Sequence, residues 1–167
     1  MKKNNVILIG MPGCGKSTVG VVLAKAMGLQ FVDSDIVIQQ TMNMKLSEII
    51  EQYGDIGFRK IENDVNAGLD MENTVIATGG SVIYGPEAMA HLREIGTVVY
   101  LQLSYEGIAD RLGDLHARGV TLLPGQTLLD LYNERIPLYE QYAHITVHTD
   151  DMRLREVVAY LQEKLAE

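Results

Sequence analysis

Cysteine, basic residues and long apolar runs are scarce in this amino-acid sequence, and each shortage excludes a class of protein. The only cysteine, Cys14, permits no intramolecular disulfide, so we expect a reducing, intracellular compartment. Lysine and arginine together number 14 against 22 aspartate and glutamate residues, which gives a formal net charge of -8. This balance argues against nucleic acid or an anionic membrane as the main partner, because both require a basic face.

The apolar runs are too short for a secretory signal or a membrane span. The first, Val6–Ile9, is interrupted by Gly10 and Pro12, whereas a signal peptide needs an apolar core of about 7–15 residues. No later run approaches the roughly 18 residues needed to cross a bilayer. We therefore expect a cytoplasmic protein, and the length of 167 residues suits a single domain.

Short apolar runs alternate with longer amphipathic segments along the chain. Strands are expected at residues 6–9, 31–33, 74–77, 97–103 and 145–148. Helices are expected at residues 17–27, 36–52, 58–69, 86–93, 104–112, 127–142 and 154–165. Continuously apolar strands are typical of a parallel sheet with helices on both faces. The pattern predicts one three-layer α/β/α domain over residues 1–167, with a five-stranded parallel sheet and ligands at the carboxyl ends of its strands.

A glycine-rich segment follows the first expected strand. Residues 10–17, GMPGCGKS, match the pattern G-x-x-x-x-G-K-[ST] between a strand and a helix, which is the context that a P-loop requires. We expect phosphates to be surrounded by the backbone N–H groups of Gly13, Cys14, Gly15 and Lys16. The N-terminus of the following helix would add positive potential there. Lys16 is expected to contact the β- and γ-phosphates and Ser17 to bind Mg²⁺. The motif predicts a P-loop NTPase fold that binds a nucleoside triphosphate with magnesium.

Carboxylates occur close to this motif in the predicted fold. The chain lacks the guanine-reading N-K-x-D motif of switch GTPases, but FVDSD places Asp33 and Asp35 on either side of Ser34. Alternate residues of an extended segment share a side, so both carboxylates would project beside the P-loop. One is expected to hold a magnesium-bound water and the other to accept the proton of an attacking hydroxyl. The alternative for Asp35 is a cap on the following helix.

Two further segments each allow two interpretations. In GDIGFRKIE, residues 54–62, Arg59 and Glu62 lie three positions apart on one helix. They form either a surface ion pair or an arginine that Glu62 holds toward an anionic ligand. Residues 113–126, GDLHARGVTLLPGQ, are either a surface loop or a lid, since loops of this length are often lids.

The chain contains, in order, the four segments GMPGCGKST, FVDSD, GFRKIE and ATGGSV, followed by NERIPLYEQYA at residues 133–143. Taken together, these segments resemble the shikimate kinases. These are small P-loop kinases of the aromatic amino-acid pathway with the fold of the nucleoside monophosphate kinases. The resemblance extends from about Val6 to the last expected helix. It implies ATP- and Mg²⁺-dependent phosphorylation of the 3-hydroxyl of shikimate, giving shikimate 3-phosphate and ADP. It also implies a mobile lid at about 113–126 and an acceptor-binding helical region at about 34–62.

The resemblance further implies roles for individual residues. The expected ATP-binding residues are Gly13, Cys14, Gly15, Lys16, Ser17 and Thr18, with Arg153 near the adenine. Mg²⁺ would be bound by Ser17 and, through water, by Asp33. Asp35 would hold ring hydroxyls of shikimate and act as the base. The other expected shikimate-binding residues are Arg59 and Arg135 for its carboxylate, and Gly79 and Gly80 through their backbone N–H groups.

The chain departs from the family pattern in two places. The family usually has three glycines after the threonine of ATG, whereas Gly79 and Gly80 are followed here by Ser81, which bears on the wall of the acceptor pocket. The family's lid usually contains Arg-Pro-Leu-Leu, whereas this segment reads ARGVTLLPGQ. Arg118 is the first candidate for a catalytic lid arginine that contacts the phosphates, and Arg111 is the second. The alternative for Arg118 is a solvated loop charge.

Two other functions stay open on the sequence alone. The first is a related P-loop kinase acting on gluconate or a nucleoside monophosphate, although two arginines and the DSD pair suit a polyol acid better than a nucleotide. The second is a regulatory module that binds ATP without turnover, against which the complete set of P-loop and acidic residues argues. We expect a monomer, because the fold needs no partner chain to complete its site.

Overall fold

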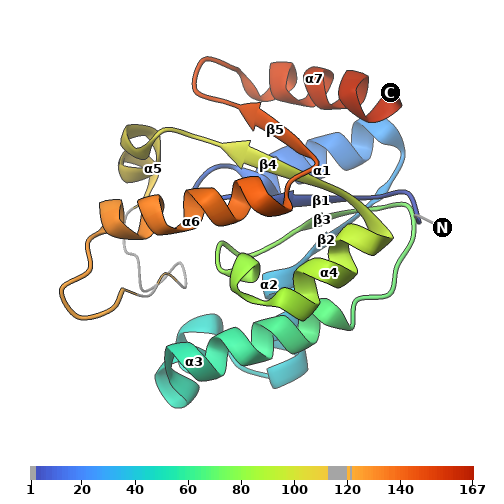
Figure 1. Ribbon diagram of the computed structural model, residues 1–167. Coiled ribbons are helices and arrows are strands. Elements are labelled where there is room, and N and C mark those ends of the chain that lie inside the picture. Colours follow the sequence, from blue (N-terminus) through green and yellow to red (C-terminus); the bar gives the residue numbers. More distant parts are fainter. Residues whose placement is uncertain (1–2, 113–119, 121) are drawn as a thin grey trace.

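Five parallel strands form a single sheet in the computed structural model, which describes residues 3–112, 120 and 122–167 (Figure 1). The strands are β1 (Asn5–Ile9), β2 (Gln30–Asp33), β3 (Thr74–Ala77), β4 (Gly96–Gln102) and β5 (Ile145–His148). Their order across the sheet is β2-β3-β1-β4-β5, and every neighbouring pair is parallel. The central strand β1 is buried along its whole length. The α/β class and the five-stranded parallel sheet predicted from the sequence are therefore confirmed.

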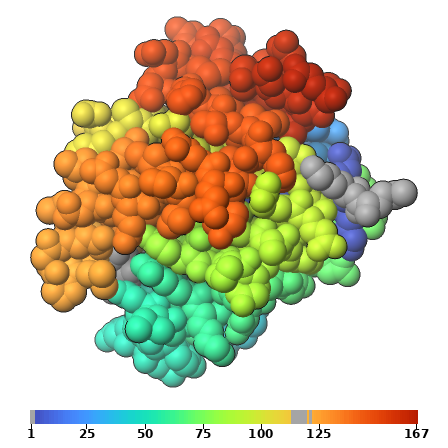
Figure 2. Space-filling model, viewed as in Figure 1, coloured from blue at the N-terminus to red at the C-terminus, as the bar shows by residue number. Residues whose placement is uncertain are grey.

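Helices cover both faces of the sheet. They are α1 (Lys16–Met27), α2 (Ser34–Met42), α3 (Leu46–Ala67), α4 (Pro86–Ile95), α5 (Tyr105–Arg111), α6 (Leu128–Tyr142) and α7 (Leu154–Ala166), with a 3-10 turn η1 (Val82–Tyr84). Helix α1 packs against α7 and the strands β1 to β3, whereas α4 and α6 pack against β4 (Figure 1). In Figure 2, α6 and α4 cover the near face, and α3 lies below them. Within the described part of the chain, no helix has the length and apolar character needed to cross a membrane.

The helices between β2 and β3 divide differently from the sequence prediction. A helix was expected over residues 36–52 and another over 58–69, but α2 ends at Met42 and α3 continues from Leu46 to Ala67. Asn43 ends α2 because it adopts a left-handed conformation (φ 52°), which apolar spacing does not reveal. Gly54 (φ 71°) absorbs a kink within α3 instead of ending it. The two helices share a small apolar cluster of their own, formed by Ile38, Ile49, Ile50 and Phe58.

A buried asparagine joins the amino-terminal edge of the sheet to the chain around it. Asn5, only 2% exposed, donates from Nδ2 to the carbonyl oxygens of Met71 at 2.8 Å and Ile95 at 3.1 Å. Its Oδ1 accepts a hydrogen bond of 3.0 Å from the backbone N–H of Thr74. One side chain thus forms hydrogen bonds with three backbone groups, which lie just before β3, at the start of β3 and at the end of α4.

We expect Asn5→Ala to lower the free energy of unfolding by about 2–4 kcal/mol, because it removes three hydrogen bonds, including the one that Asn5 Oδ1 accepts from the buried N–H of Thr74. The control is Asn4→Gly, since Asn4 is exposed, donates a hydrogen bond to the side chain of Asn73 and has a φ of 54° that glycine adopts easily. Urea unfolding of both variants measures the difference. Equal losses of stability in the two variants would contradict the role given to Asn5.

Candidate active site

The loop between β1 and α1 has the conformation that its glycines allow. Gly13 and Gly15 have φ angles of 82° and 101°, in the left-handed region that other residues rarely adopt. The Nζ atom of Lys16 folds back across this loop and donates hydrogen bonds to the carbonyl oxygens of Gly10 at 2.7 Å and Met11 at 3.0 Å. Lys16 is 8% exposed, and no carboxylate of the described residues lies within 4.0 Å of its ammonium group. A buried ammonium with only neutral partners favours an anion in the adjacent space.

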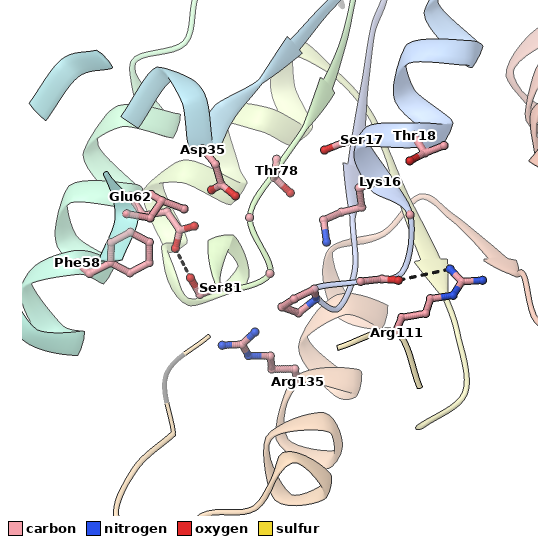
Figure 3. Close-up of a pocket in the computed structure, with 16 residues that line it drawn as sticks. Lys16, Ser17, Thr18, Asp35, Phe58, Glu62, Thr78, Ser81, Arg111 and Arg135 are labelled. Atoms are coloured by element: carbon pink, nitrogen blue, oxygen red, sulfur yellow. Dashed lines mark hydrogen bonds between the residues drawn. The ribbon is translucent and has the colours of Figure 1, made fainter. Parts of the chain in front are cut away.

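Ser17 and Asp33 meet at the edge of this loop. Ser17 Oγ donates a hydrogen bond of 3.0 Å to Asp33 Oδ2. The other carboxylate oxygen of Asp33 accepts from the backbone N–H of Asp35 at 2.9 Å and caps α2. The alternative in which Asp35 caps this helix is therefore wrong, and the Asp35 carboxylate faces the cavity described next (Figure 3).

The oxygen atoms of Ser17 and Asp33 suit Mg²⁺. This ion prefers oxygen ligands and is usually held by only one or two protein carboxylates, with water and phosphate completing its shell. In residues 3–112, 120 and 122–167 there is no group of three or more His, Cys, Asp or Glu that could hold a metal on its own. A shared site with nucleotide phosphates is the arrangement that these residues fit.

A cavity of about 680 Å³ extends from the loop to α3 and α6 (Figure 3). Its lining includes the following residues that the sequence singled out: Gly13, Gly15, Lys16, Ser17, Thr18, Asp35, Glu62, Gly79, Gly80, Ser81, Arg111 and Arg135. The other lining residues are Pro12, Leu46, Phe58 and Thr78. The phosphate-binding motif and most of the expected acceptor-binding residues thus share one space.

Several expected site residues stand apart from this lining. The Cys14 side chain is 3% exposed and packs in the main core, so only its backbone belongs to the loop. Arg153 is exposed and is the N-cap residue just before α7, where its backbone N–H donates to Glu156 Oε2 at 2.8 Å. Arg118 lies outside the described residues. The second candidate, Arg111, reaches the loop and donates from Nη1 to the Gly13 carbonyl at 3.3 Å.

Two arginines contact the ring of Tyr84. The guanidinium carbon of Arg59 lies 3.8 Å from the ring centroid, and that of Arg135 lies 5.4 Å from it. Arg135 is 2% exposed, and its Nε has no hydrogen-bond partner in the described structure. The predicted pairing of Arg59 with Glu62 is wrong, because no ion pair joins them among the residues described. Stacking on Tyr84 replaces it, and no helical spacing signals a partner 25 positions away.

Two carboxyl groups with raised pKa values border Gly79. Burial, followed by the charge of Asp33, raises the pKa of Asp35 to about 6, although Lys16 opposes this. Burial raises the pKa of Glu62 to about 7, against an opposing hydrogen bond from Ser81. A Cβ atom on Gly79 would lie 2.7 Å from Asp35 Oδ1 and 2.8 Å from Glu62 Oε2. Both carboxyl groups therefore lie next to Gly79, and a side chain at this position would collide with both unless they moved.

We expect Glu62→Gln to stabilise the protein at pH 8 but not near pH 4.5. The folded protein keeps Glu62 protonated up to about pH 7, whereas the unfolded chain loses that proton near 4.5. Between these values the folded state binds more protons, so the contribution of Glu62 to stability falls as the pH rises. Unfolding at both pH values measures this, with Glu51→Gln on the exposed side of α3 as the control. A change in the free energy of unfolding of Glu62→Gln that is the same at both pH values would contradict the burial cost assigned to the Glu62 charge.

Comparisons with known proteins agree with this geometry. A family model described as shikimate kinase matches residues 12–166. Shikimate kinase of Thiobacillus denitrificans is 37% identical over 167 residues, which cover 98% of this chain and 91% of the relative. That of Paracidovorax citrulli is 39% identical over 163 residues, covering 95% and 88%. The structure of shikimate kinase from Acinetobacter baumannii in complex with shikimate superimposes with a TM-score of 0.89 at 33% identity, covering 98% and 93%. The chain therefore belongs to the shikimate kinase family.

Proposed function

We propose that this protein transfers the γ-phosphoryl group of ATP to the 3-hydroxyl of shikimate, giving shikimate 3-phosphate and ADP. The observation that carries the proposal is the single cavity that Lys16, Asp35 and Arg135 share. It offers positive charge at the P-loop, a carboxylate from α2 and a buried arginine from α6. The membership of the shikimate kinase family and the likeness to a relative in complex with shikimate support this choice of acceptor.

The P-loop side of the cavity is proposed to bind ATP. The backbone N–H groups from Gly13 to Thr18 surround the phosphates, and the N-terminus of α1 adds positive potential. Lys16 leaves its carbonyl partners to contact the β- and γ-phosphates, and Arg111 lies beside the same loop. Bound at Ser17 and Asp33, Mg²⁺ would neutralise phosphate charge. Arg153 is proposed to lie near the adenine.

The opposite side is proposed to bind shikimate. Asp35 orients the attacking hydroxyl and accepts its proton. Arg59 and Arg135 bind the carboxylate, to which the planar guanidinium group is suited. Gly79 and Gly80 present backbone N–H groups where a side chain would collide, since a Cβ on Gly80 would lie 2.6 Å from Pro12 Cδ.

The segment proposed as a lid, residues 113–126, would cover the bound substrates. Arg118 within it would contact the phosphates. Closure of a lid excludes water, which would otherwise receive the phosphoryl group in place of the acceptor.

A panel of acceptors with coupled detection of ADP tests the proposed function. We expect ADP release with shikimate, and none above the ATP background with gluconate or a nucleoside monophosphate. Turnover with either of the latter in place of shikimate would assign the chain a different acceptor. Tight ATP binding without turnover on any acceptor would indicate a regulatory module.

Lys16→Ala is expected to abolish turnover while the fold stays intact, because Lys16 meets the phosphoryl group as its charge develops. Lys25→Ala on the exposed side of the same helix is the matched control and should keep wild-type rates. ADP release and circular dichroism of both variants provide the measurement. Near-normal turnover by folded Lys16→Ala protein would remove the P-loop from the mechanism.

Arg59→Lys should raise the KM for shikimate and leave the KM for ATP nearly unchanged. Lysine keeps the charge but loses both the bidentate fork and the guanidinium contact with the Tyr84 ring. A loss of about 1.5–3 kcal/mol in acceptor binding corresponds to a rise in this KM of roughly 10- to 150-fold. Arg93→Lys, an exposed change on α4, is the control. A rise in the KM for ATP alone would place Arg59 on the nucleotide side.

A further inference from the structure

Ser81 follows the two glycines at the point where the family pattern usually has a third. Its Oγ donates a hydrogen bond of 2.5 Å to Glu62 Oε1, drawn as the dashed line between them in Figure 3. Glu62 lies on α3 and is 1% exposed, whereas Ser81 lies in the loop after β3. Glycine has no hydroxyl to make this contact, so the contact depends on the serine of this chain.

The second carboxylate oxygen of Glu62 has no partner. Oε2 is buried and accepts no hydrogen bond in the described structure, although Glu62 lines the cavity. A Cβ on Gly79 would lie within 3 Å of both this oxygen and Asp35 Oδ1, at 2.8 and 2.7 Å. The missing side chain at Gly79 leaves room next to both carboxyl groups. A buried acceptor atom beside such a space favours a ligand that donates a hydrogen bond.

Charged groups from three helices act on Glu62. Asp35 on α2 raises the pKa of Glu62, whereas Arg135 on α6 and Arg59 on α3 lower it. Burial is the largest cause and brings the pKa to about 7, and the Ser81 hydrogen bond is the largest opposing one. Ser81 therefore favours the ionised form of Glu62, in which both oxygens accept hydrogen bonds.

We propose that Ser81 is a positioning residue that holds the Glu62 carboxylate beside Asp35, with Oε2 directed to a hydroxyl group of the acceptor. The proposal rests on the proposed function, because it takes the acceptor to be a small polyhydroxy carboxylate. In this arrangement Asp35 and Glu62 divide the acceptor hydroxyls between them, while Arg59 and Arg135 hold its carboxylate. Ser81 acts only through Glu62.

Steady-state rates with shikimate and ATP across about pH 6–9 test the proposal on wild type, Ser81→Ala, Ser81→Gly and Ser81→Thr. We expect the alanine and glycine variants to raise the KM for shikimate about three- to tenfold, with the KM for ATP unchanged. The acid limb of kcat/KM should move up by about half a pH unit or more, because Glu62 loses the donor that favours its ionised form. The threonine variant keeps the hydroxyl and should behave as wild type.

Thr74→Val is the matched control at the other end of β3. It removes a hydroxyl that donates to the Glu72 carbonyl at 2.8 Å, far from the cavity. It should leave the KM for shikimate and the acid limb unchanged. If Ser81→Ala and Ser81→Gly match this control in both quantities, Ser81 does not position Glu62.

Stability measurements separate this inference from the proposed function. The loss of stability in Ser81→Ala should be larger at pH 8 than at pH 5, because the hydroxyl favours only the ionised form of Glu62, whose pKa is about 7. The loss in Thr74→Val should not change with pH. If wild type does not phosphorylate shikimate, the proposed function fails, yet a pH-dependent loss still supports the link between Ser81 and Glu62. A loss in Ser81→Ala that is independent of pH overturns that link.

Discussion

The ionisable side chains of one cavity have too few oppositely charged or hydrogen-bonding partners within the protein. The binding properties of the site depend on this incomplete pairing. Lys16 and Arg135 are buried cations without a carboxylate partner among the described residues. Asp35 and Glu62 respond to burial with pKa values raised to about 6 and 7. A buried charge without a partner is costly, so a ligand that supplies the missing partners is favoured. The arrangement fits anionic groups at both ends of the cavity and hydroxyl groups between them.

The sheet fixes these groups relative to one another. The P-loop continues β1, and the loop with Gly79 and Gly80 continues the neighbouring strand β3. Thr78 joins the two strands where they end, since its backbone N–H and its Oγ1 both donate to the Leu8 carbonyl, at 3.2 and 2.8 Å. The nucleotide side and the acceptor side are therefore extensions of two paired, buried strands. Their separation is set by strand spacing more than by flexible loops.

Local patterns in the sequence were enough to predict the fold and the main residues of the site. The features that they did not predict depend on contacts between residues far apart in the sequence. The P-loop and the FVDSD segment are contiguous, so their chemistry was visible before the structure. Helical spacing correctly put Arg59 and Glu62 on one helix. It did not show that Arg59 contacts the Tyr84 ring and that Glu62 accepts a hydrogen bond from Ser81, in place of an ion pair with each other. Both partners come from a loop and a 3-10 turn with no periodic signal. The break at Asn43 was missed for a related reason, because a single left-handed residue leaves the apolar pattern intact.

The short segment Gly79–Ser81 lines the cavity and has neighbours in α3, α6 and the P-loop, so it belongs to both halves of the site. Ser81 bonds to α3 through Glu62, and the Gly80 carbonyl accepts a hydrogen bond of 2.6 Å from Tyr139 on α6. A Cβ on Gly80 would lie 2.6 Å from Pro12 of the P-loop and 2.9 Å from Arg135 Nη1. The P-loop, α3 and α6 therefore all lie against these three residues, so the nucleotide side and the acceptor side of the cavity share this segment as a common wall.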